Sequence, residues 1–142
     1  MSKGKRAERE AAEHYEAAGY RTFRPQESQY GETDIYGLFD ILAVPPAGAN
    51  DKVRLVQVKS NRAAGIEAWT EEAMAYYSSS VHVEFLVRYD GEPGPHTPPE
   101  RWRLICPFQD PFNRHETVLD ERDDDVAGGG EGLTEYLSRD DT

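Results

Sequence analysis

The hydrophobic pattern in the first half of the chain predicts one helix followed by three strands. Between residues 4 and 18, small and aromatic apolar side chains recur at three- and four-residue steps, the spacing of one helix face, and Gly19 is suited to end that helix. Residues 20–24 alternate in polarity and predict a strand. Apolar runs at residues 38–44 and 53–59, separated by a turn rich in Pro and Gly, predict an antiparallel hairpin.

The second half predicts a helix over residues 66–78 and strands over residues 81–89 and 101–106. The expected fold class is therefore α/β, a mixed five-stranded sheet flanked by helices in the order αβββαββ. We expect this domain to span residues 1–107. Residues 108–142 are acidic and contain glycine, so we expect a largely disordered tail with a short helix at Leu133 to Leu137.

Charge is distributed unevenly along the chain. The formal net charge is −11, which disfavours binding to phosphate. Residues 108–142, however, hold 11 acidic and 3 basic residues, which leaves 16 acidic and 13 basic residues in the expected domain. The basic residues are 12 arginines and four lysines, and this bias with an acidic surface is typical of proteins adapted to high salt. On that hypothesis the negative charge reflects the solvent and not the partner.

Several kinds of protein are disfavoured by the composition. The basic N-terminus is followed by charged residues, so it does not resemble a signal peptide, and no apolar run reaches the length of a membrane span. The single cysteine, Cys106, excludes an internal disulfide and a zinc site built from cysteines. We therefore expect a cytoplasmic protein. The four histidines fall in four different segments with no common spacing, which disfavours a histidine metal site.

The predicted hairpin carries the candidate chemistry. Asp40 interrupts an apolar strand, while Gln57 and Lys59 are two residues apart and project from one face of its partner. A carboxylate, an amide oxygen and an ammonium group then meet at one end of the sheet, with the carbonyl of Val58 as a further ligand. Such a set suits Mg²⁺-assisted hydrolysis of a phosphodiester. Glu8, on the apolar side of the first helix, is a second candidate carboxylate.

Three segments in this order resemble the archaeal Holliday junction resolvases, a branch of the PD-(D/E)xK nucleases: KGKRAERE at 3–10, FDILA at 39–43 and VQVKS at 56–60. Residues 24–28 and 101–105 extend the resemblance to about residues 3–107. It implies a restriction-endonuclease-like domain and a homodimer that cuts four-way junctions with Mg²⁺, for which Mn²⁺ can substitute. It implies Glu8, Asp40 and Lys59 as catalytic residues. With Gln57 as a fourth catalytic residue, the candidate metal ligands are Asp40, Gln57, Val58 and Glu8. Implied DNA contacts are Lys5, Arg6, Arg9, Arg24, Ser28 and Arg62.

One position departs from the family pattern. The family has Glu two residues before the catalytic lysine, whereas this chain has Gln57, which keeps an oxygen ligand and loses its charge. Glu27 or Glu32 in the neighbouring loop is a candidate replacement carboxylate. Two other functions stay open: a nuclease of the same fold that acts on flaps, mismatches or foreign duplex DNA, and a catalytically silent junction-binding protein.

Structural explanations compete with these assignments. An isolated Asp40 is also compatible with a structural ion pair to Lys52 or Lys59, and Glu8 with an exposed helix position. Aromatic residues of the second predicted helix are more typical of core or dimer contacts than of base stacking. The acidic run at residues 123–125 is typical of a solvated segment, although an acidic tail that competes with DNA for the binding groove is the alternative.

Overall fold

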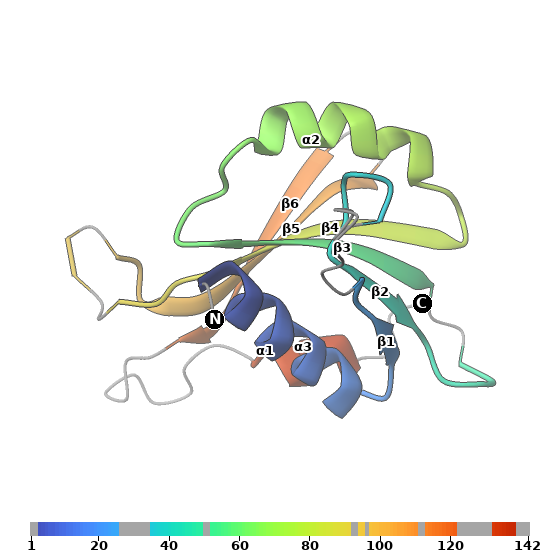
Figure 1. The fold of residues 1–142 in the computed structure, drawn as a ribbon, viewed down its shortest axis with the longest axis horizontal. Coiled ribbons are helices and arrows are strands. Elements are labelled where there is room, and N and C mark those ends of the chain that lie inside the picture. The colour runs from blue at the N-terminus through green and yellow to red at the C-terminus, as the bar shows by residue number, and fades with distance from the viewer. Residues whose placement is uncertain are drawn as a thin grey trace.

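The computed structural model describes residues 3–25, 35–49, 52–91, 94–95, 97–110, 113–121 and 132–138. The elements in chain order are α1 (Lys3–Ala17), β1 (Arg21–Phe23), β2 (Ile41–Val44), β3 (Val53–Ser60), α2 (Ile66–Ala73), the 3-10 helix η1 (Met74–Tyr76), β4 (Val81–Arg88), β5 (Glu100–Asp110), β6 (Asn113–Glu121) and α3 (Leu133–Ser138). Figure 1 shows a single sheet with helices on both faces. The α/β class expected from the sequence is confirmed.

The strands lie side by side in chain order, from β1 to β6. Strands β3 and β4 run parallel and are joined by the crossover through α2, while every other neighbouring pair among these strands is antiparallel. The predicted hairpin of the second and third strands is present, with Ile41 opposite Val56. The mixed sheet thus places the two strands of the candidate site next to one another.

The sheet separates two hydrophobic cores. Helices α1 and α3 cover one face, and α2 covers the other (Figure 1). Strand β3 contributes to both cores because alternate side chains of a strand point to opposite faces. Val56 and Val58 pack under α1, whereas Leu55 packs under α2 with Trp69.

Helix α1 forms where the three- and four-residue spacing predicted it. Its side chains Ala7, Ala11, Ala12 and Tyr15 are all buried against the sheet. The small alanines let the helix backbone approach the strands closely, and Tyr15 fills the space nearer the helix end. No helix in the described part of the chain is long and apolar enough to cross a lipid bilayer.

The sheet has six strands and not five, and the expected domain boundary at residue 107 is wrong. Strand β5 runs on to Asp110 and pairs with β6, which lies entirely in the expected tail. The short helix predicted near the C-terminus is present as α3, but it belongs to the core, since Leu133 and Leu137 are fully buried. The acidic composition of the segment did not indicate β6 and α3, because only a few of their side chains are buried and these suffice to pack them against the core. Residues 122–131 and 139–142, also expected to be disordered, lie outside the described residues.

Candidate active site

A tight turn places Asp40 directly before the first residue of β2. The residues before β2 form a turn in which Ile35 pairs with Phe39, and Tyr36 and Gly37 both have positive φ angles, 58° and 71°. Two consecutive left-handed residues are the signature of a type I′ turn. The indole Nε1 of Trp69 donates a 2.7 Å hydrogen bond to the carbonyl of Leu38 and so fastens the turn to α2. The sequence predicted that Asp40 interrupts a strand over residues 38–44. In the structure Asp40 comes directly before β2 instead.

The Asp40 carboxylate binds the backbone of β3. Its Oδ2 accepts a 2.8 Å hydrogen bond from the N–H of Val58, and the N–H of Asp40 donates a 2.7 Å bond to the carbonyl of Val56. The ladder between β2 and β3 ends at Ile41 and Val56, so the carboxylate takes the place of a strand partner. This contact satisfies a backbone donor and also holds the carboxylate between the positions of Gln57 and Lys59.

The alternation of β3 sets the directions of the neighbouring groups. Gln57 and Lys59 share the face of Leu55, the α2 face, and both side chains are half-buried. Asp40 lies two residues before Leu42, which also packs on that side. The N–H and C=O of one strand residue point to the same side, so the carbonyl of Val58 points, like its N–H, toward Asp40.

Glu8 comes from the layer that covers the opposite face. It is half-buried and lies on the apolar side of α1, as the sequence predicted. Helix α1 runs antiparallel to β3 and β4, because Glu10 contacts Arg88 at the end of β4 while Tyr15, further along the helix, lies near Arg54 at the start of β3. Glu8 therefore faces the same end of β3 as Lys59, from the other side of the sheet.

The expected DNA contacts differ in exposure. Arg6 and Arg9 on the first half of α1 and Arg62 just after β3 are exposed, whereas Lys5 and Arg24 are half-buried. Arg9 lies 4.0 Å from Glu13, a loose pair on the helix surface. Ser28, and with it Glu27 and Glu32, lies outside the described residues.

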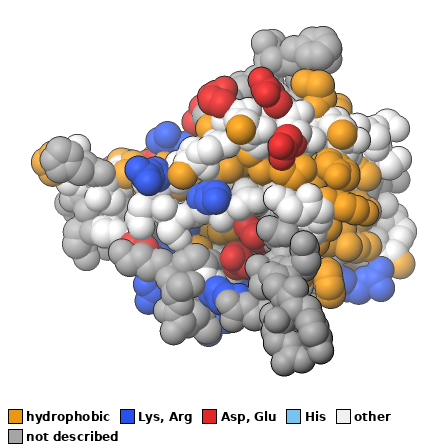
Figure 2. Space-filling model, turned by 45° about the horizontal axis from the view of Figure 1, so that its top comes forward, with side chains coloured by type: hydrophobic (Ala, Val, Ile, Leu, Met, Phe, Trp, Pro, Cys, Tyr) orange, Lys and Arg blue, Asp and Glu red, His pale blue; other side chains and the backbone are white. Residues whose placement is uncertain are grey.

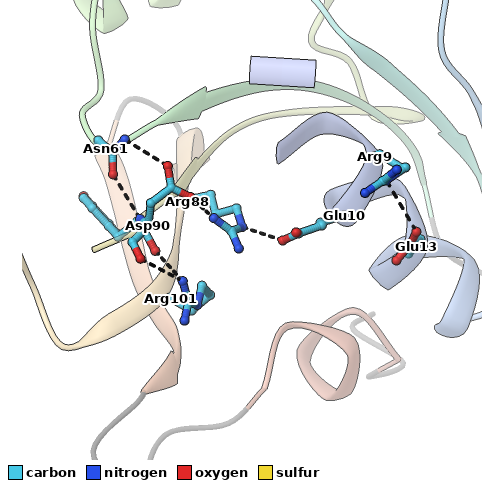
Figure 3. A network of polar contacts seen from close by, with 8 residues as sticks. Arg9, Glu10, Glu13, Asn61, Arg88, Asp90 and Arg101 are labelled. Carbon is cyan, nitrogen blue, oxygen red and sulfur yellow. Dashed lines mark hydrogen bonds and ion pairs between the residues drawn. The ribbon is translucent and has the colours of Figure 1, made fainter. Parts of the chain in front are cut away.

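A polar network near the end of β3 and β4 was not predicted. Arg88 donates from Nε to Glu10 on α1 at 2.5 Å and from Nη1 to Asp90, which in turn exchanges two hydrogen bonds with Asn61 (Figure 3). Asn61 has a φ angle of 69°, which Asn tolerates better than most residues. That an asparagine directly follows a strand was the sequence signal available, and it does not reveal the partners.

A second unpredicted cluster is buried under α1, in the middle of the sheet. Arg54 forms a 2.8 Å ion pair with the fully buried Glu84 and donates to the hydroxyl of Tyr20 at 2.9 Å. Burial and the nearby Glu84 raise the pKa of Tyr15. Burial is also the main cause that lowers the pKa of His82. These groups stabilise the core and lie away from the candidate site.

The comparisons with known proteins give a distant likeness among solved structures. No family model and no curated protein matches the chain. Among solved structures, Hjc of Archaeoglobus fulgidus, described as a Holliday junction resolvase from an archaeal hyperthermophile, aligns over 94% of this chain and 99% of its own with 15% sequence identity and a TM-score of 0.47. At this similarity the comparison assigns no activity to the chain.

Proposed function

We propose that the chain is a Mg²⁺-dependent endodeoxyribonuclease with a PD-(D/E)xK-type active site that cuts branched DNA, with four-way junctions as the preferred substrate. The observation that carries the proposal is the hydrogen bond between Asp40 Oδ2 and the N–H of Val58. It supports a site in which the Asp40 carboxylate and the Val58 carbonyl lie together, flanked by the side chains of Gln57 and Lys59.

The donor atoms fit a hard divalent cation. Asp40, Gln57 and Val58 offer a carboxylate, an amide oxygen and a backbone carbonyl, all oxygen ligands of the kind that Mg²⁺ prefers. Among the described residues no group of three or more His, Cys, Asp or Glu side chains is arranged to hold a metal ion. Asp40, Gln57 and Val58 would suffice for Mg²⁺ because that ion uses one or two protein carboxylates and takes further ligands from water and substrate phosphate. When bound, the metal polarises the phosphate and activates water for in-line attack.

Each side chain would have a separate role in the reaction. Asp40 and Gln57 hold the cation, and Lys59 orients the attacking water and stabilises the charge that develops on the phosphate. Glu8 supplies a second carboxylate from α1. Attack by water at the phosphorus would break the P–O3′ bond, so the products would carry a 5′-phosphate and a 3′-hydroxyl.

The residues that would contact DNA and the residues that would contact a second copy of the chain belong to different segments. Arg6 and Arg62 belong to the segments that flank the candidate site, whereas the exposed side chains of α2 include Glu67, Glu71 and Glu72, which disfavour phosphate. Figure 2 shows hydrophobic side chains gathered beside acidic ones on the face covered by α2. Phe23 is 57% exposed and Tyr36 68% exposed. The proposal includes a homodimer, the arrangement that two paired cuts require, with Phe23 and Tyr36 as candidate contact residues.

Gln57 also favours a second candidate function. An amide in place of a carboxylate weakens the hold on a divalent cation, and the described residues supply no clear substitute. A protein that binds branched DNA without cutting it would keep the same fold and the same cationic residues.

The experiment that tests the proposal uses labelled four-way junction, flap and linear duplex of matched length, each with Mg²⁺, with Mn²⁺ and with a chelator. Paired cuts on the junction that need the metal support the proposal, and cuts confined to flaps or duplex favour another nuclease of this fold. Tight binding without cutting favours the second candidate function, a protein that binds branched DNA and does not cut it. Lys59→Ala is the control expected to be inactive, because it removes the water-orienting amine and leaves the metal ligands. Normal cutting by this variant would contradict the assigned site.

A further inference from the structure

We infer that Arg88 is a positioning residue for the proposed reaction, and this inference rests on the proposed function. Arg88 lies at the end of β4, with its side chain 13% exposed. Its guanidinium donates to Glu10 on one side, at 2.5 Å, and to Asp90 on the other. It is therefore occupied by two carboxylates and is not one of the cationic groups that would contact DNA.

The clamp formed by Glu10, Arg88, Asp90 and Asn61 joins the two segments that supply the candidate site. On the helix side, Glu10 is two residues from Glu8. On the strand side, the N–H of Asn61 donates to the carbonyl of Arg88 at 2.7 Å, and Asn61 is two residues from Lys59. Arg88 thus links α1 to the residue that follows β3.

Further hydrogen bonds hold the strand side of the clamp in place. The amide Nδ2 of Asn61 donates to Asp90 Oδ2 at 3.2 Å, and the N–H of Asp90 donates back to Asn61 Oδ1 at 3.0 Å. Arg101 adds a 2.9 Å hydrogen bond from Nη1 to the carbonyl of Tyr89 (Figure 3). These bonds fix Asp90, to which the Arg88 guanidinium is bound, so we expect loss of that guanidinium to disturb the residues after Lys59 as well as α1 near Glu8.

Loss of the clamp should lower the rate of cutting more than the binding of DNA. Misplacement of catalytic groups by about 1 Å can reduce a rate by as much as ~100-fold. For Arg88→Gln we expect kcat to fall about tenfold or more while KM for junction DNA stays within about twofold. Arg88→Lys keeps a cation between the carboxylates and should recover part of the rate. Adding Glu10→Gln to Arg88→Gln should cost little more, because both changes open the same clamp.

Arg103→Gln is the matched control. Arg103 also has two carboxylate partners, Glu100 at 2.5 Å and Glu116 at 3.8 Å, but it joins β5 to β6 and not α1 to β3. It should lower the thermal unfolding midpoint as Arg88→Gln does while leaving kcat within about twofold of wild type.

The outcomes separate the two claims. If wild type cuts the junction and Arg88→Gln keeps the wild-type kcat, the inference is overturned and the proposed function stands. If wild type cuts no substrate, the proposed function fails, and amide hydrogen exchange then decides whether the clamp exists. Faster exchange of residues 58–61 in Arg88→Gln, and not in Arg103→Gln, supports the clamp, and equal exchange overturns it.

Discussion

Asp40 Oδ2 accepts a hydrogen bond of 2.8 Å from the N–H of Val58, so one carboxylate completes the hydrogen bonding of a strand where the neighbouring strand has stopped. The contact has two consequences that can be measured separately. A carboxylate or an amide oxygen can accept the bond, but the carboxylate also provides the negative charge that a divalent cation needs.

Asp40→Asn should therefore keep the fold and lose the cutting. The amide oxygen still accepts from Val58, so we expect the free energy of unfolding to fall by no more than about 1 kcal/mol, whereas Asp40→Ala leaves a backbone donor without its acceptor and costs about 1–3 kcal/mol. Urea unfolding and junction cutting, measured on both variants, check this. A purely structural Asp40 would give an Asn variant that cuts at the wild-type rate.

Gln57→Glu should strengthen metal-dependent activity. The added charge lies on the same strand face as Lys59 and beside Asp40, so the site would hold Mg²⁺ more tightly. We expect cutting to reach its half-maximal rate at a Mg²⁺ concentration about tenfold lower, which corresponds to ~1.4 kcal/mol of binding. A Mg²⁺ titration of the cutting rate measures this, and Gln57→Ala is the control that should shift it the other way. A lower rate at every Mg²⁺ concentration in Gln57→Glu would show that Gln57 is not a ligand.

His82 should make stability depend on pH below neutrality. Burial lowers its pKa, Arg54 and Lys52 lower it further, and Glu84 opposes them. The unfolded chain binds the proton more readily, so this contribution to stability is complete above the unfolded pKa of about 6.5 and is lost as the pH falls from there toward the folded pKa. Urea midpoints at several pH values between 8 and 5 should fall more steeply for wild type than for His82→Gln. Parallel curves would contradict the prediction.

Leu137→Ala should destabilise the whole domain. Leu137 is 1% exposed and packs with Leu133 against the core under α1, so truncation leaves a cavity that costs about 2–5 kcal/mol. Glu135→Ala, an exposed change on the same helix, should leave the unfolding midpoint nearly unchanged. Equal midpoints for the two variants would mean that α3 is not docked in solution.

The sequence by itself determined the elements whose local pattern is strong. The alanine spacing of α1, the apolar runs of β3 and β4 and the turn of the hairpin were sufficient, because a helix or strand with one buried face must repeat its apolar residues at that element's period. The same alternation placed Gln57 and Lys59 on one face. It also identified Asp40 as unusual, since an acid beside an apolar strand needs a specific partner.

The tertiary structure decided which distant groups meet. No local pattern indicates that the Asp40 carboxylate would bond to Val58, that Arg88 would bridge α1 to the end of β4, or that β6 and α3 would complete the core. These contacts join residues far apart in the chain, and their energy depends on a geometry that exists only after the layers have packed. Charge density made residues 108–142 look unfolded because composition averages over a segment, whereas packing onto the core depends on a few buried side chains such as Leu119, Leu133 and Leu137.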